Sequence, residues 1–158
     1  EKVLAEAPPS RIGKALVDSF ITPFEREDIE ALRSALYKIP KQTERFADRY
    51  ALAPRRIEGI DFAPRAAMLE QGARIVQEMV VELEQLRLEP MTVLDERLRA
   101  LESEADRLLL ETYRDLYSGR HDAGTTFLLR DLFEMLEKAI DRCREAGGVA
   151  FHIALKNA

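Results

Sequence analysis

The chain has 158 residues, of which 46% are hydrophobic and 34% charged, with a formal net charge of −5 at pH 7. This size and composition predict one domain over residues 1–158, with enough apolar surface for a single core. The longest apolar runs hold three or four residues, whereas a membrane-spanning helix needs roughly 20, so an integral membrane protein is excluded. One cysteine, Cys143, and two histidines exclude an internal disulfide and a thiolate–imidazole zinc site, so we expect a reducing, cytoplasmic location.

The middle of the chain is mildly basic. Residues 38–65 carry seven basic and four acidic side chains, which alternate along the segment. Because nucleic acid binding requires several phosphates to be neutralised together, this excess is too small and too mixed, and we expect no nucleic acid partner. It is compatible with a weak contact to an acidic partner or to anionic lipid head groups through Lys38, Lys41, Arg45, Arg49, Arg55 and Arg56.

The first half of the chain predicts two helices. Apolar residues recur at spacings of three and four, which indicates helix and argues against β-strands. The first helix is expected over residues 10–20, and the second starts near residue 25 with acidic residues in its first turn. Because proline lacks the amide proton that a helix interior uses, Pro40 predicts a break or a kink before the chain continues to Pro54.

Two long helices follow after a loop. One is expected over residues 64–88, and its wide apolar face is typical of a buried bundle helix. Pro90 then turns the chain into a helix over residues 93–117, with Thr92 and Asp95 as a capping box. The apolar positions of this second helix alternate spacings of four and three, which predicts a seam of the coiled-coil type.

The last helix is expected to begin near residue 125, after a loop over residues 118–124, and to end at Gly147 and Gly148, beyond which the pattern is weak. Short loops between long helices make antiparallel neighbours, so the chain is expected to form an all-α, up-and-down bundle of four to six helices. A faint internal repeat relates two triplets of residues at helix starts, namely Asp28, Ile29 and Leu32 with Asp131, Leu132 and Met135.

Carboxylates are the side chains with the clearest chemical potential. Glu102 and Asp106 lie four residues apart in one predicted helix, and Glu137, Asp141 and Glu145 are spaced by four in another. Each set therefore shares a helical face beside the apolar stripe. Oxygen ligands that converge from two helices suit hard cations such as magnesium, manganese or iron, so these five residues form a candidate metal site.

A simpler interpretation is that the same acids lie on a solvent-exposed helix edge, where they form salt bridges. With 29 acids in 158 positions, about five pairs at a spacing of four are expected by chance, and the chain has six. The count therefore does not separate a metal site from an ordinary charged surface. Basic partners for such an edge are present on the same helices, namely Arg99, Arg107, Lys138, Arg142 and Arg144.

The sequence offers no catalytic constellation, so we expect a non-enzymatic protein. Neither His121 nor His152 has a glutamate three residues before it, which excludes the Glu-x-x-His pairs of ferritin-like di-iron proteins. Cys143 lies on an apolar stripe with no histidine nearby, as a buried small hydrophobe would. The glycines form neither a phosphate-binding loop nor a dinucleotide-binding motif, so no organic cofactor is expected.

Three strings resemble a known family. They are FITPFEREDIEAL at residues 20–32, LESEADRLLLE at residues 101–111, and LFEMLEKAIDRCREAGGVAFHIALKNA at residues 132–158. Together they look like the PhoU-like phosphate transport regulators, accessory proteins of Pit-type inorganic phosphate transporters. The resemblance runs from about residue 12 to the end of the chain, and it implies a PhoU-like bundle of two three-helix repeats, the first helix being truncated.

The resemblance also implies a metal ion, either divalent or ferric, with iron, zinc or manganese as the choices. PhoU-type proteins hold metal through Glu/Asp-x-x-x-Asp pairs, and Glu102 with Asp106 and Glu137 with Asp141 match these pairs in the second repeat. The first repeat departs from the family pattern where relatives carry aspartates, because this chain has other residues there, namely Tyr37, Lys38 and Lys41.

The function that the resemblance implies is a regulator of phosphate transport. Its partner would be a Pit-type phosphate transporter, and the protein would be a cytoplasmic homo-oligomer, peripheral at the inner membrane face. The alternative is a metal-free helical scaffold that acts through oligomerisation or by binding a partner helix. Metal content and an effect on phosphate uptake distinguish these two interpretations.

Overall fold

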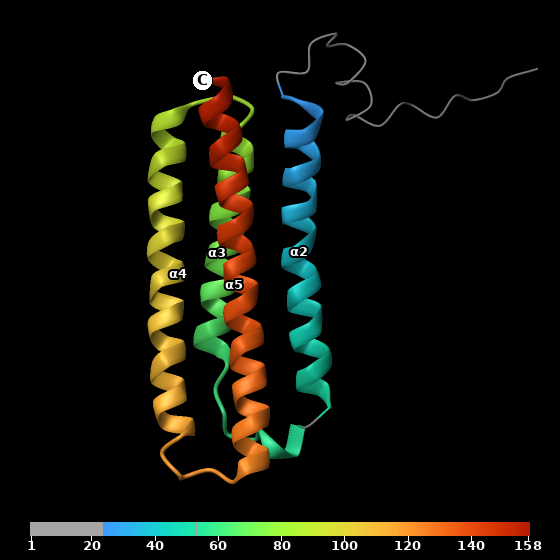
Figure 1. Ribbon diagram of the computed structural model, residues 1–158, viewed down its shortest axis with the longest axis vertical. Coiled ribbons are helices and arrows are strands. Elements are labelled where there is room, and N and C mark those ends of the chain that lie inside the picture. The colour runs from blue at the N-terminus through green and yellow to red at the C-terminus, as the bar shows by residue number, and fades with distance from the viewer. Residues whose placement is uncertain (1–23, 53) are drawn as a thin grey trace, which may run out of the picture.

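The computed structural model describes residues 24–52 and 54–158. Over these residues the chain forms four α-helices and one 3-10 helix, without a β-strand, and helices that follow one another in the chain run antiparallel (Figure 1). The prediction of an all-α antiparallel bundle is confirmed, and the helix expected over residues 10–20 lies outside the described residues. The elements are α2 (Arg26–Ala51), η1 (Pro54–Arg56), α3 (Ala63–Glu82), α4 (Leu88–Leu116) and α5 (Ala123–Asn157).

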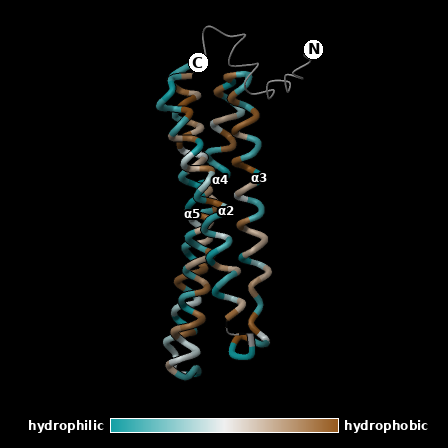
Figure 2. The backbone as a smooth tube through the Cα atoms, turned by 90° about the vertical axis from the view of Figure 1, so that its right-hand side faces the viewer, coloured by the Kyte–Doolittle hydropathy of each residue, from teal (hydrophilic) through white to brown (hydrophobic). Residues whose placement is uncertain are grey.

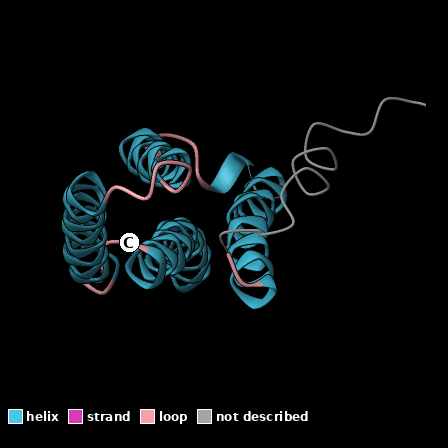
Figure 3. Cartoon of the chain, turned by 90° about the horizontal axis from the view of Figure 1, so that it is seen from above, coloured by secondary structure: helices cyan, strands magenta, loops and turns pink. Residues whose placement is uncertain are grey.

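Helix α5 is the central element. It packs against α2, α3 and α4, and α3 also packs against α4, so these three helices form a triangle to which α2 is added on the α5 side (Figure 3). Hydrophobic and hydrophilic residues alternate along each helix, as expected for helices with one buried face (Figure 2). The largest fully buried side chains come mostly from α4 and α5 and include Leu98, Leu129, Leu132, Leu136 and Ile140.

Helix α2 passes through Pro40 without ending, so the expected break there is wrong. Pro40 is exposed, and its missing amide hydrogen bond lies on the solvent side of the helix. Leu32, Ile39 and Phe46 pack against the core on both sides of the proline. Their burial holds both halves of α2 against α5.

Helix α5 also continues through Gly147 and Gly148, where the sequence predicted its end. Gly147 is buried against α4, and a Cβ atom at this position would overlap the Cδ2 atom of Leu98. The glycine therefore permits close approach of two helices instead of ending one of them. The last turns of α5 contribute Ala150, Ile153 and Ala154 to the core, which stabilises the helix beyond the glycines.

Helix α4 begins at Leu88, five residues earlier than expected, with Pro90 in its first turn, where an amide proton has no partner within the helix. The expected capping box does not form. The hydroxyl of Thr92 donates to the carbonyl of Leu88 at 2.9 Å, and Asp95 is buried. Helix α5, in contrast, has a capped start, because the side chain of Asp122 accepts from the amide of Thr125.

The faint sequence repeat has a counterpart in the pairing of α2 with α5. Asp28, near the start of α2, accepts from Lys156 at the end of α5 at 2.9 Å. Asp131, near the start of α5, lies 3.3 Å from Arg49 at the end of α2. An acid in the first half of each helix thus meets a cation near the end of the other helix.

Candidate functional site

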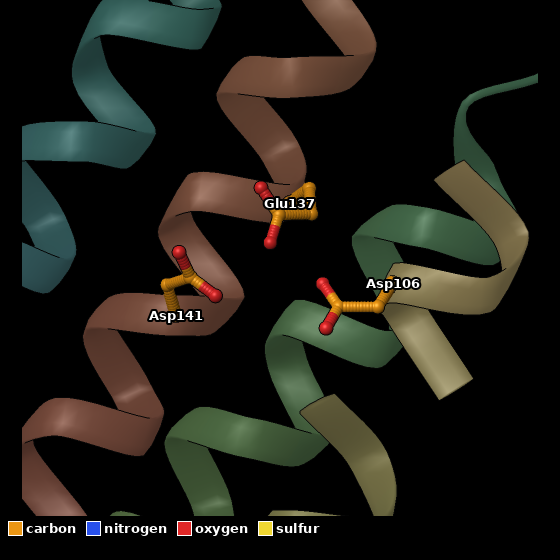
Figure 4. Close-up of side chains that lie close together, drawn as sticks. All are labelled: Asp106, Glu137 and Asp141. Atoms are coloured by element: carbon orange, nitrogen blue, oxygen red, sulfur yellow. The ribbon is translucent and has the colours of Figure 1, made fainter. Parts of the chain in front are cut away.

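Three of the five predicted ligands converge between α4 and α5. Asp106 projects from α4, and Glu137 and Asp141 project from successive turns of α5 (Figure 4). One carboxylate oxygen from each residue lies within 4.8 Å of the other two. Among the described residues, no other set of three acidic, histidine or cysteine side chains meets this test.

The three carboxylates converge because each one follows, in the sequence, a buried residue of the α4–α5 interface. Asp106 follows the buried Ala105, whereas Glu137 and Asp141 follow the buried Leu136 and Ile140. A residue that follows a seam position lies at the edge of the helix interface, where side chains of both helices meet. Asp106 is exposed, and Glu137 and Asp141 are half-buried, so the site opens to solvent on one side.

Glu137 has an unusual protonation equilibrium. Burial, a hydrogen bond to Asp141 and the negative charges of Asp141 and Asp106 raise the pKa of Glu137 to about 8. Because its carboxyl keeps a proton at pH 7, the three side chains share this proton in place of a third negative charge. A bound cation would take over the role of the proton.

Glu102 lies at the margin of this cluster, one turn from Asp106 on α4. Its carboxylate is 3.5 Å from the guanidinium of Arg144. Burial raises the pKa of Glu102, Arg144 opposes this effect, and the charges of Asp141 and Asp106 add to it. The charges of Asp106 and Asp141 therefore act on Glu102, which is already paired with Arg144.

Glu145 is not brought to the cluster. Lys38 of α2 donates to one of its oxygens at 2.5 Å and Arg142 donates to the other at 2.6 Å. These hydrogen bonds lower the pKa of Glu145. The ammonium group of Lys38 therefore neutralises the Glu145 carboxylate from the neighbouring helix α2.

Lys138 pairs with one of the three central carboxylates. Its ammonium donates to Asp141 at 3.2 Å, and the side chains of both residues are partly exposed. This ion pair offsets part of the negative charge of the cluster. Because an exposed pair of this kind contributes little to stability, about 1 kcal/mol or less, a divalent cation can displace the lysine.

The donor set consists of carboxylates alone, which fits some metals better than others. Magnesium, manganese and iron accept oxygen ligands of this type, with water in the remaining coordination positions. Zinc prefers histidine and cysteine ligands, and neither residue lies in the cluster. The residues present therefore fit a hard cation held mainly by Asp106, Glu137 and Asp141.

Asp95 was missed as a buried charge by the sequence analysis. It is 4% exposed and accepts from Arg99 at 2.7 Å and from Arg144 at 3.2 Å. The available signals were its place beside the seam residue Leu94 and the arginine four residues later. Arg144 thus links Asp95 and Glu102 and fixes the edge of the site next to the metal candidates.

Cys143 lies in the core, as its apolar stripe predicted. Its side chain is fully buried, and this burial raises the pKa of the thiol to about 12. A thiol that keeps its proton at neutral pH is a poor nucleophile. Cys143 lies next to Gly72 of α3 and contributes to the packing between α3 and α5.

The fold and the site define an antiparallel helical bundle with a half-buried carboxylate cluster between two helices. No family model matches the chain. The chain is similar to the UPF0111 protein YkaA of Bacillus subtilis, with 23% identity over 145 residues, which cover 92% of this chain and 71% of the relative. Along the described residues, every helix is too short or too polar to cross a membrane.

Proposed function

We propose that this protein is a non-enzymatic accessory protein of a Pit-type inorganic phosphate transporter, and that the α4–α5 carboxylate site binds a hard metal cation. The observation that carries the metal part is the convergence of Asp106, Glu137 and Asp141 from two helices. The transporter part is supported by the three sequence strings that resemble the PhoU-like regulators and by the all-helical bundle that the described residues form.

A metal at this site would act on the protein through charge and through helix pairing. The cation would replace the proton of Glu137 and remove the repulsion among the three carboxylates. Since Asp106 belongs to α4 and the other two to α5, the bound ion would also join the two helices. Metal binding would thereby fix the shape and charge of the surface offered to the transporter.

A metal-free scaffold is the second candidate function, and one observation favours it. Most acids around the site already have cationic partners within the chain: Lys138 pairs with Asp141, Arg144 with Glu102, and Lys38 with Glu145. In this interpretation the carboxylates need no metal, and the protein acts through its own oligomer or through a partner helix.

Phosphate uptake in cells tests the transporter role. Uptake of labelled phosphate is measured in cells that lack the gene and in cells that express either the native chain or a site variant, Glu102→Ala, Asp106→Ala, Glu137→Ala and Asp141→Ala. The matched control replaces four exposed acids outside the site, namely Glu30, Glu58, Glu84 and Glu96.

We expect gene loss to change transporter-dependent uptake, and the native chain and the control to restore it. If the site variant fails to restore it, the metal site is needed for the function. Full restoration by the site variant would favour the metal-free scaffold. Uptake that is unaffected by loss of the gene would contradict the transporter role itself.

A further inference from the structure

The two ends of the bundle differ in charge. The loop end, defined as residues 45–65 and 114–131, holds η1 and the α4–α5 loop and carries eight arginines and six acids. The opposite end, defined as residues 25–30, 78–89 and 152–158, carries three basic residues and eight acids. Both ends are visible in Figure 1, with the loop end at the bottom. An anionic surface would therefore attract the loop end and repel the opposite one.

Several arginines of the loop end are available to an external anion. Arg45, Arg55 and Arg114 are exposed, and their guanidinium groups form neither an ion pair nor a hydrogen bond with any described residue. Arg56 is also exposed, and its guanidinium lies 3.9 Å from Asp122, a loose pair in which both side chains face solvent.

The acids of the same end are largely occupied by local contacts. Asp115 pairs with Arg120 and with His121, and Asp122 accepts from the amide and the hydroxyl of Thr125. Asp61 accepts from the amide of Ala63 at 2.9 Å. Asp48 and Glu58 are exposed and lie at this end as well. With eight arginines against six acids the loop end keeps a net positive charge, whereas the opposite end, with three basic residues and eight acids, is net negative.

Large apolar side chains stand among these arginines. Leu52 is 77% exposed, Phe127 is 71% exposed and Tyr117 is 60% exposed. They lie at the end of α2, in the second turn of α5 and at the end of α4, respectively. Apolar and aromatic side chains flanked by arginines are the composition that lies in the interface of an anionic bilayer.

A packed aromatic cluster lies at the same end of the bundle. Phe62 contacts the rings of Phe46, Tyr50 and Phe133, at centroid distances of 5.6, 5.8 and 4.8 Å. The cluster joins α2, the segment before α3, and α5. The loop end is therefore a preorganised surface, which lowers the entropy lost when it docks.

We propose that the loop end docks on an anionic phospholipid bilayer, with the arginines at the head groups and Leu52, Tyr117 and Phe127 in the interface. Exposed apolar side chains also occur at the opposite end, for example Val81 and Leu155, but that end carries eight acids against three basic residues. Charge thus selects which end faces the membrane. The inference needs neither the metal site nor a transporter, so its failure would leave the proposed function untouched.

Vesicle flotation tests the proposal with the full chain. Vesicles of phosphatidylglycerol and phosphatidylcholine are compared with vesicles of phosphatidylcholine alone, at low and at high salt. The loop-end variant reverses three charges, Arg45→Glu, Arg55→Glu and Arg114→Glu. The matched control reverses three charges on exposed arginines elsewhere, Arg26→Glu, Arg33→Glu and Arg97→Glu, and circular dichroism verifies that both variants fold.

We expect binding to the anionic vesicles that weakens as salt rises and that drops by about tenfold or more in the loop-end variant, while the control keeps most of it. Equal losses in the two variants would overturn the proposal, because the attraction would then be unspecific. Equal binding to neutral vesicles would overturn it as well. Absence of vesicle binding would also overturn it and would assign the patch to an acidic protein partner.

A fluorescent probe tests the orientation separately. The chain contains no tryptophan, so Leu52→Trp and Leu155→Trp each place a single indole at one end of the bundle. Both positions are exposed, and the substitutions replace one exposed apolar side chain by another. Anionic vesicles should shift the emission of the Leu52→Trp protein to shorter wavelength and leave that of the Leu155→Trp protein unchanged. A shift at Leu155→Trp instead would contradict the assignment of the docking end.

Discussion

The carboxyl groups of Asp106 and Glu137 meet across the interface of α4 and α5, where Asp141 completes a cluster with all three ligand oxygens within 4.8 Å of one another. The contact joins the LESEADRLLLE string to the last helix, and it brings the exposed Asp106 to two half-buried acids. In the absence of a cation, the protein relieves their repulsion by keeping a proton on Glu137.

This proton makes folding stability dependent on pH. The pKa of Glu137 is raised to about 8 in the folded chain, against an ordinary value near 4.5. The folded state therefore binds more protons than the unfolded state between these values, and its stability should fall as pH rises from about 4.5 to about 8. Glu137→Gln removes this slope, and metal-free denaturation curves at several pH values measure it.

Glu134 is a control whose pKa shift has the opposite sign, so its effect on the pH dependence of stability is also opposite. Hydrogen bonds from Tyr113 and Arg130 lower its pKa, so its charged form stabilises the folded chain above the ordinary carboxyl pKa. Glu134→Gln should therefore reduce stability at neutral pH, and the effect should disappear as the carboxyl of the native chain becomes protonated in acid. A steep pH slope that survives Glu137→Gln would contradict the role given to Glu137.

Close packing at Gly147 predicts a destabilising substitution. Gly147→Ala places a Cβ atom against Leu98 Cδ2 and near Met79 Sδ, so we expect a loss of about 1–3 kcal/mol from overpacking. Gly148→Ala is the comparison, because its Cβ atom would lie 3.2 Å from the Nη1 atom of Arg144, which has to shift only slightly, and because alanine improves helix propensity by about 0.5–1 kcal/mol. Denaturant titrations compare the two, and equal effects would argue against the packing role of Gly147.

The buried charge of Asp95 predicts a second stability effect. Asp95→Ala leaves Arg144, whose side chain is mostly buried, without this partner, and we expect a loss of about 2 kcal/mol or more. Glu78→Ala removes an exposed pair with Arg97 and should change stability by about 1 kcal/mol or less. Thermal or chemical unfolding of the two variants distinguishes a buried pair from a surface pair.

The periodicity of apolar residues was sufficient to predict the helices and their antiparallel order, because each helix buries one continuous face. It failed at Pro40, Pro90 and Gly147, where the local rules for proline and glycine predict ends or turns. In each case tertiary packing or position in the first helical turn determined the outcome. Local propensity is a weak term compared with the burial of a long apolar face.

The candidate site could be predicted only in part, because the spacing of residues within one helix does not show which side chains a neighbouring helix presents. Spacing placed Asp106, Glu137 and Asp141 at helix edges, and this was enough to bring them together. Whether an acid at such an edge meets another acid or a cation depends on the neighbouring helix. Lys38 of α2 reaches Glu145 from 107 residues away in sequence, and no spacing within α5 indicates that contact.

Metal content tests the central claim most directly. Elemental analysis is made on protein purified without chelator and without a metal-affinity tag, for the native chain, for Glu137→Gln with Asp141→Asn, and for Glu145→Gln as the control. A metal ion such as manganese or iron should be present in stoichiometric amount in the native chain and in the control and absent from the double variant. A native chain that stays free of metal, even after incubation with these ions, would contradict the site.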